Sequence, residues 1–270
     1  MADITKELAI PAGVSNLPVL TQDLNGLLEV LEENMGAAQI SVSTLDKIKL
    51  PSAGTDFFQV QTIDGPVPMK ELVGVVVGVD SGRAFWRTDD SAGTPPDCSS
   101  GDLFHGYGNR GNDANDGPHD CVTCPLNQFG SAMKDGKAQA GKACGERKLL
   151  LFLLDDGILP QVVQVPGTSI KNWDTYLTRL SNYKTAFTGV ATKISMVDAQ
   201  SRGGQKYKKM DFASGGSLPQ DARLKVKAYA NMLKDKMAKA SPALGASEDA
   251  PPPYADAEAP TFEHEEGANG

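Results

Sequence analysis

The sequence predicts a mainly β fold with flanking helices, divided into three parts. Eight short runs rich in β-branched and aromatic residues lie between residues 38 and 212, with turn residues between them. All four cysteines lie in one glycine-rich stretch between two of these runs, and residues 241–270 are rich in Ala, Pro, Glu and Asp. We therefore expect an N-terminal helical segment (1–37), a β domain (38–240) with a loop inserted at 95–147, and a tail (241–270).

The N-terminal segment predicts one helix over residues 21–35. Its apolar residues recur at helical spacing between a polar start at Thr21 and Gly36, a residue that favours the end of a helix. They are Leu24, Leu27, Leu28, Val30 and Leu31. We expect this helix to pack against the domain.

The β domain begins where the apolar residues change to the two-residue period of strands. Turn residues at Asp64–Pro66 and Asp80–Gly82 separate the runs and favour an antiparallel meander. Gly74 and Gly78 interrupt one run, and such glycines allow the sharp bending that a small closed barrel demands of its strands. The runs cover residues 40–50, 57–61, 72–79 and 84–88.

The second half of the domain alternates strands and helices. Thr168 or Ser169 is expected to cap the first helix, and Pro219 starts the last one. The pattern predicts strands at 148–154 and 161–165, a helix at 170–182, strands at 185–196 and 206–212, and a helix at 219–239. One helix inserted before the last two strands is compatible with an OB-like antiparallel barrel.

The stretch that holds the cysteines has no apolar core of its own, which indicates that a metal fixes it. Its spacing is C-x22-C-x2-C-x19-C, and a Cys-x-x-Cys turn directs two sulfur atoms at one point. Four ligands leave no open position, so we predict a structural Zn²⁺ ion rather than a catalytic one. The predicted ligands are Cys98, Cys121, Cys124 and Cys144.

Other uses of these cysteines stay open. Two disulfides or buried free thiols are alternatives, but Met1–Glu7 has no basic start followed by an apolar core, so we expect a reducing cytoplasm. The compact cysteine runs of iron–sulfur proteins are absent. His105 or His119 could replace Cys98 as a ligand, although both are more simply read as exposed loop residues.

No catalytic residues are predicted. Gly136–Lys142 matches a phosphate-binding loop, but Ala143 stands where the magnesium-binding Ser or Thr belongs. The His119-Asp120-Cys121 stretch lacks the preceding His-x-Glu of zinc deaminases. Asp155 and Asp156 could hold Mg²⁺ as in nucleases, but two carboxylates before a glycine are more typical of a turn.

The charge is distributed unevenly. The net charge is −8, yet seven of the 34 acidic residues and none of the 26 basic ones lie in the tail, which we expect to be disordered. Residues 201–240 carry ten Lys or Arg against three Asp. A basic segment beside an acidic tail is typical of proteins whose tail competes with a polyanion. No apolar run approaches the roughly 18 to 20 residues that cross a bilayer.

An OB-like barrel binds single strands by stacking bases on aromatic rings beside a positively charged groove. The alternative for each ring is a place in the core, and Lys206 and Lys208 face away from Tyr207 and Lys209 within a strand. The candidates for binding are Arg83, Phe85, Trp86, Arg87, Trp173, Tyr176, Arg179, Lys184, Phe187, Lys193, Lys206, Tyr207, Lys208 and Lys209.

In this combination the chain resembles the single-stranded DNA-binding proteins of tailed bacteriophages. The residues that carry the resemblance are the four cysteines, Lys206–Lys209, the tail from Glu248 to Glu266, and Gly141–Cys144 running into Arg147-Lys148. The resemblance implies a non-catalytic protein that coats single-stranded DNA with little sequence preference during replication, recombination and repair in the host cytoplasm, with self-association on DNA. It also implies that the tail recruits a polymerase or helicase.

A second interpretation keeps the zinc but not the nucleic acid. In it the chain is a zinc-ribbon adaptor in transcription or replication, and its Lys-rich last helix binds an acidic protein partner.

Overall fold

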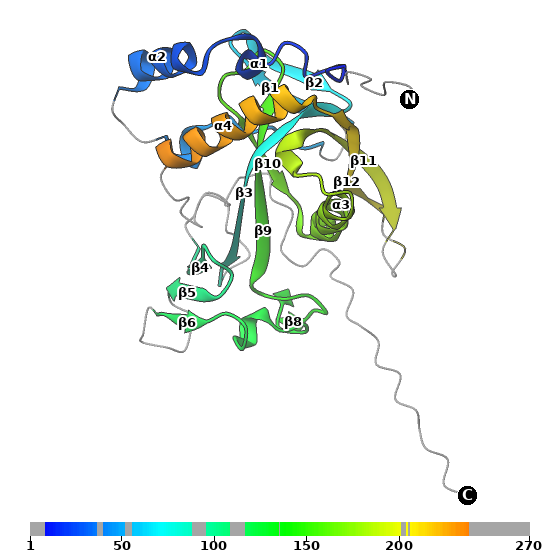
Figure 1. Cartoon of the computed structure of the whole chain (residues 1–270). Helices are drawn as coiled ribbons and strands as arrows, with labels where there is room; N and C mark the ends of the chain where they lie inside the picture. The colour runs from blue at the N-terminus through cyan, green and yellow to red at the C-terminus, as the bar shows by residue number, and fades with distance from the viewer. Residues whose placement is uncertain are drawn as a thin grey trace, which may run out of the picture.

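The computed structural model describes residues 9–36, 40–51, 56–87, 96–108, 117–134, 136–200, 204 and 206–237. Figure 1 shows a bent antiparallel sheet, helices above it, and a unit of short strands at the lower ends of β3 and β9. We call this unit, residues 96–108, 117–134 and 136–144, the cysteine module.

The main sheet has five strands in the spatial order β10-β9-β3-β11-β12, and all neighbours are antiparallel. β3 is the central strand because its first residues pair with β11 on one edge, and it pairs with β9 along the other edge. The bounds are β3 (Leu72–Phe85), β9 (Gly145–Leu154), β10 (Gln161–Val165), β11 (Val190–Gln200) and β12 (Lys206–Ser217).

β3 bends where it crosses β9. The register of the two strands shifts between Val76 and Gly78, and such a bulge increases local twist. A Cβ atom at Gly78 would lie 2.7 Å from Leu151 Cδ1, and one at Gly74 would overlap the backbone oxygen of Leu153. Both glycines are therefore required by the close passage of β9.

The cysteine module continues the sheet along the edge of β3. β4 (Cys98–Ser100) pairs with the last residues of β3, β5 (His105–Gly108) pairs with β4, and β6 (His119–Asp120) pairs with β5. β7 (Met133–Lys134) and β8 (Lys137–Ala138) form a separate hairpin. The module is thus held between the end of β3 and the start of β9.

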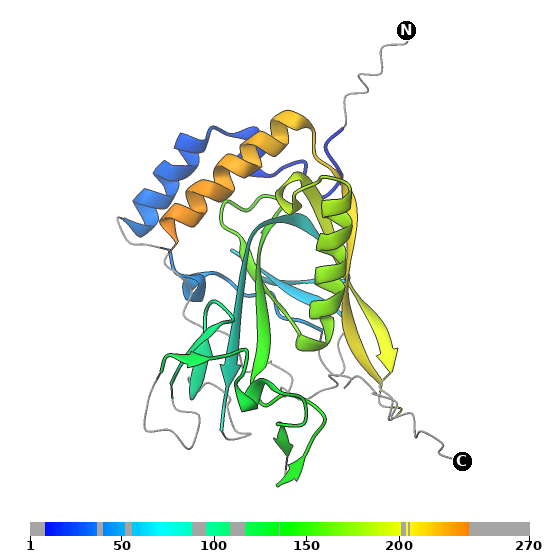
Figure 2. The ribbon, with the colours of Figure 1, turned by 60° about the horizontal axis from the view of Figure 1, so that its bottom comes forward.

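One apolar core lies between the sheet and three helices, α1 (Pro18–Thr21), α2 (Leu24–Met35) and α4 (Gln220–Lys236). It buries Val75 and Val77 of β3 together with Leu151 and Leu153 of β9. Figure 2 shows α2 and α4 side by side, where Lys236 Nζ lies 3.2 Å from Glu32 Oε1. These helices cover this face of β3 and β9.

The second core lies on the other face of the sheet, around α3 (Ile170–Asn182). Trp173 and Tyr176 of α3 pack with Val76, Phe152 and Phe212 from three strands. The hairpin of β1 (Phe58–Thr62) and β2 (Gly65–Met69) also contributes to this core. Two apolar cores of this size account for the stability of the sheet.

The mainly β character with flanking helices is confirmed, and so are the helices predicted at 21–35, 170–182 and 219–239. A short helix, α1, precedes the first of them and was not predicted. Ser169 occupies the cap position of α3, but its hydroxyl accepts a hydrogen bond from Met210 N (2.9 Å) instead of capping the helix.

The strand predictions were less accurate. The turn predicted at Asp80–Gly82 is wrong, because these residues pair with β9 inside one long strand, β3. Residues 40–50 form a 3-10 helix (Val42–Thr44) and single bridges instead of a strand. In the part of the chain that is described, no pairing joins β10 to β12, so the sheet is not a closed barrel.

The tail prediction (241–270) lies outside the described residues. Within those that are described, no helix combines the length and the apolar character needed to cross a bilayer.

Candidate metal and nucleic-acid site

The strands of the module bring the four cysteines to its interior. Cys98 begins β4 and pairs with Gly108, Cys121 N donates to Phe104 O (2.8 Å), and Cys144 N donates to Leu126 O (2.8 Å). All four are buried, between 6% and 8% exposed, and no disulfide joins them. Cys98 and Cys144 form a small cluster with Phe85, and Leu126 and Ala143 pack against it.

The sulfur atoms converge. A Cβ atom at Gly106 would lie 3.2 Å from Cys121 Sγ and 3.3 Å from Cys98 Sγ, so two sulfur atoms border one point. Burial is the main reason that the pKa of the Cys144 thiol is raised to about 12, an effect that the Arg83 guanidinium opposes. The other three thiols also raise this pKa, so all of them lie within electrostatic reach of Cys144.

This cluster suits a divalent cation chemically. Burial also raises the pKa of Cys121, and a bound Zn²⁺ reverses such a shift because it stabilises thiolates. Among the described residues, no three His, Cys, Asp or Glu side chains are arranged to hold a metal ion as they stand. The suitability of this cluster for Zn²⁺ therefore rests on the proximity of four buried thiols. Their side chains would have to move closer together to coordinate the ion.

The two histidines are already engaged elsewhere. His105 is exposed, and its Nδ1 lies 2.6 Å from Asp102 Oδ2. Hydrogen bonds from the backbone and ring of His105 hold the pKa of Asp102 well below its usual range. His119 is buried, contrary to the simpler reading of it as an exposed residue, and its Nε2 donates to Gly108 O (2.9 Å). These bonds favour the cysteines over the histidines as ligands.

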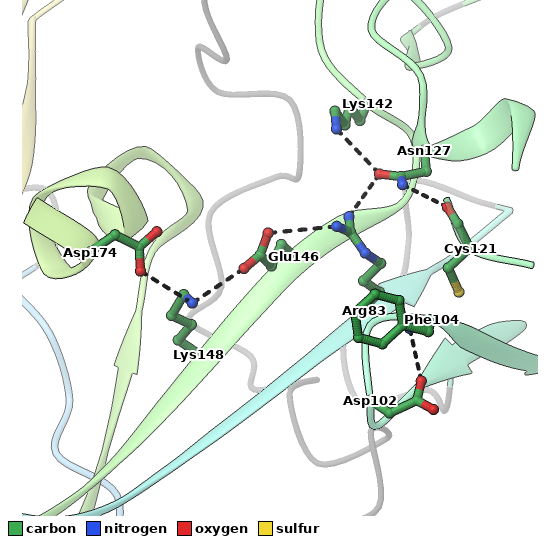
Figure 3. A network of polar contacts seen from close by, with 9 residues as sticks. All are labelled: Arg83, Asp102, Phe104, Cys121, Asn127, Lys142, Glu146, Lys148 and Asp174. Carbon is green, nitrogen blue, oxygen red and sulfur yellow. Dashed lines mark hydrogen bonds and ion pairs between the residues drawn. The ribbon is translucent and has the colours of Figure 1, made fainter. Parts of the chain in front are cut away.

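A chain of charged side chains runs from α3 across the sheet toward the module (Figure 3). Asp174 of α3 lies 3.3 Å from Lys148 Nζ, which lies 3.4 Å from Glu146 of the same strand, β9. Glu146 lies 3.7 Å from Arg83 Nη2 on β3. Arg83 is only 15% exposed, so it serves as the link to the module rather than as a surface cation.

Asn127 receives this link inside the module, as Figure 3 shows. Its Oδ1 accepts hydrogen bonds from Arg83 Nη1 (2.7 Å) and Lys142 Nζ (3.3 Å). Its Nδ2 donates to Cys121 O (2.7 Å), which places Asn127 between the guanidinium and the Cys121–Cys124 turn. One buried amide thus joins the cysteine turn to the sheet.

We expect Asn127→Ala to loosen the module, because it leaves the carbonyl oxygen of Cys121 and a donor of Arg83 without their partner. The cost of such a loss is about 1–3 kcal/mol. Amide hydrogen exchange of residues 117–134, followed by mass spectrometry, should accelerate roughly tenfold or more. The matched control is Asn182→Ala at the exposed end of α3. Equal exchange in the two variants would contradict this role.

Three of the predicted base-binding rings lie in cores, and a fourth packs against one. Trp173 and Tyr176 are 0% and 3% exposed, and the Trp173 ring centroid lies 5.2 Å from that of Phe212. Phe187 packs against the same core, and Phe85 packs on Cys98 and Cys144. A buried ring cannot lie on a base, so Trp173, Tyr176 and Phe85 are corrected from binding candidates to core residues, whereas Phe187 is only partly buried.

Trp86 and Arg87 lie where β3 leaves the sheet toward the module. Trp86 is half-buried, and the guanidinium of Arg147 on β9 lies 4.5 Å from its ring centroid. Arg87 is exposed, and its backbone N–H donates to Asp97 Oδ2 (2.8 Å). Arg147 was not among the predicted site residues.

The predicted cations are spread over α3, β11 and β12. Arg179 and Lys184 are exposed on and just after α3. Two others are paired with acids: Lys193 with Glu71, and Lys208 with both Asp56 and Asp198. On β12, Lys206 is exposed, while Tyr207 and Lys209 are half-buried.

Three exposed aromatic residues of the module were missed by the sequence interpretation. Phe104 is 59% exposed, Tyr107 60% and Phe129 45%. Lys142 Nζ lies 4.8 Å from the centroid of the Phe129 ring. The sequence around them could have indicated their exposure. These aromatic residues stand among Gly, Asn and Asp in a stretch without periodic apolar residues, which is not the pattern of a segment that packs into a core.

No family model matches this sequence, and no match was found among curated proteins or solved structures.

Proposed function

We propose that the chain is a non-catalytic protein that binds single-stranded DNA with little sequence preference. The observation that carries the proposal is the connectivity of the sheet. Three antiparallel strands, β3, β9 and β10, are followed by α3 and then by the β11–β12 hairpin, whose first strand pairs back onto β3. OB folds share this connectivity, and they are five-stranded, partly open barrels.

The two connections that OB folds use for binding support the same proposal. These are the loop between the first and second strands and the loop between the fourth and fifth. Here the first connection is the cysteine module with its exposed rings, and the second leads into Lys206 of β12. Aromatic rings beside cations are the combination that binds single strands.

One feature departs from the usual use of this fold. OB folds also bind through the outer face of their second and third strands, yet α1, α2 and α4 pack over Leu151 and Leu153 of β9 and Val162 of β10. We therefore propose that the single strand contacts the module and the β11–β12 hairpin, and not this covered face.

Zinc and the tail complete the proposal. Cys98, Cys121, Cys124 and Cys144 would hold a structural Zn²⁺ ion, which would supply the cross-link that a module with little apolar core needs. The acidic tail would recruit replication proteins such as a polymerase or helicase. The absence of Lys and Arg from residues 241–270 supports this part.

Salt dependence of binding to labelled oligo-dT tests the function. Single-strand binding should weaken steeply with salt, and binding to a duplex of equal length should be much weaker. Lys206→Ala with Lys208→Ala, two residues on the same face of β12, should lower the magnitude of the salt slope by about 1.4, since each phosphate contact contributes about 0.7.

The matched control is Lys227→Ala with Lys234→Ala, which removes the same charge from exposed positions on α4. It should leave the slope unchanged. A wild-type chain that does not bind the oligonucleotide, or binds it independently of salt, would contradict the proposal and favour the zinc-ribbon adaptor.

A further inference from the structure

We infer that the cysteine module carries the base-stacking surface of this protein, made by the rings of Phe104, Tyr107 and Phe129. The inference rests on the proposed function, since it names the residues on which the unpaired bases would stack. None of the three was among the binding residues that the sequence predicted.

The module turns large apolar side chains outward. Five of the exposed large apolar residues in the described chain belong to it, although it is a small part of that chain. Besides the three rings they are Val122, 59% exposed, and Met133, 53% exposed. An apolar surface of this density on a small unit is typical of a binding site rather than of a solvated loop.

The thiols explain why Tyr107 faces solvent. Along β5, Gly106 faces inward against Cys98 Sγ and Cys121 Sγ, at 3.3 and 3.2 Å from where its Cβ would be. Because side chains alternate along a strand, Tyr107 must face outward. At this point of β5 the two sulfur atoms leave no room for a side chain larger than that of glycine.

Hydrogen bonds place Phe104 and Phe129 near the Cys121–Cys124 turn. Phe104 O accepts from Cys121 N (2.8 Å), so Phe104 lies beside the start of the turn. Gln128 Nε2 donates to Val122 O (3.2 Å), which holds Phe129, the next residue, beside its middle. The rings are thus attached to the most constrained part of the module.

The chemistry of this surface favours bases over a protein partner. The ring of Phe129 has the ammonium of Lys142 at 4.8 Å, so an aromatic face and a phosphate-binding cation lie together. The nearby carboxylates are occupied within the module: Asp102 by His105, and Asp120 by Thr123 and Val122.

The test compares ring removal with charge removal in oligo-dT titrations of the full-length protein. Phe104→Ala, Tyr107→Ala and Phe129→Ala should each weaken binding about 5- to 150-fold, the range for one stacked base. The salt slope should stay that of the wild type, because stacking releases no counterions. Tyr183→Ala, which removes a ring that is 80% exposed outside the module, is the matched control and should bind as the wild type.

A variant that adds fluorescence upon substitution separates loss of stacking from loss of folding. Phe104→Trp keeps an aromatic ring, so it should bind near the wild-type affinity, and its added fluorescence should be quenched by oligo-dT. Tyr183→Trp should show no added quenching.

The outcomes separate the inference from the proposed function. If the wild type binds oligo-dT while the three alanine variants combined bind equally well, the inference is overturned and the proposed function stands. If the triple alanine variant binds oligo-dT as the wild type does but changes its oligomeric state, the inference is also overturned. The surface would then bind a second copy of the chain. If the wild type does not bind, both are overturned.

Discussion

Replacing Cys121 and Cys124 together by serine should abolish metal binding and unfold the cysteine module while the main sheet stays folded. Structural zinc contributes on the order of 10 kcal/mol in small modules. Little else could compensate here, since the apolar cluster in the described part of the module is small: Phe85, Cys98 and Cys144, with Leu126 and Ala143 packed against them. The amides of residues 117–134 should lose their protection from hydrogen exchange, and the metal content of the purified protein should fall to background.

The sheet should survive because both large cores lie outside the module. Unchanged protection of β9 and β10 would establish this. Thr123→Ser is the matched control, because it alters the same turn and keeps the hydroxyl that donates to Asp120 Oδ2. A double serine variant with full module protection would contradict the metal account.

Trp173→Ala should destabilise the whole domain by about 3–5 kcal/mol, as measured by urea unfolding. The side chain is fully buried, and its ring packs against Tyr176 and Phe212. Its Nε1 has no hydrogen-bond partner in the described part of the chain, so Trp173→Phe removes an unsatisfied donor and should cost clearly less than Trp173→Ala.

The same pair of variants tests the correction of Trp173 from binding residue to core residue. Trp173→Phe should bind oligo-dT as the wild type does, because the ring lies under α3 and does not reach solvent. A loss of less than about 1 kcal/mol in Trp173→Ala, or weakened DNA binding in Trp173→Phe, would contradict this placement.

The sequence predicts the proximity of the cysteines better than it predicts several strand boundaries. Cysteine spacing is a local signal, and in the structure the sulfur atoms of Cys98 and Cys121 border one point while the other three thiols lie within electrostatic reach of Cys144, although the zinc site itself stays a prediction. The turn residues Asp80–Gly82 are also a local signal, but pairing with β9, more than 60 residues away, overrides them. Local β-sheet and turn propensities contain no information about a pairing strand so distant in the sequence.

The aromatic assignments failed for a related reason. Trp173, Tyr176 and Leu180 recur at helical spacing, and that stripe is typical of a buried helix face. The exposed rings of Phe104, Tyr107 and Phe129 belong to no such period. Nor does the sequence reveal that α4 packs on the N-terminal segment, where Lys225 Nζ donates to Leu20 O (2.9 Å) and closes one face of the sheet.

Native mass spectrometry of the purified chain mixed with oligo-dT measures metal and nucleic acid in one spectrum. The account predicts a chain that carries one zinc ion, binds the single strand, and does not bind a duplex of equal length under the same conditions. A metal-free chain that binds neither oligonucleotide would contradict it.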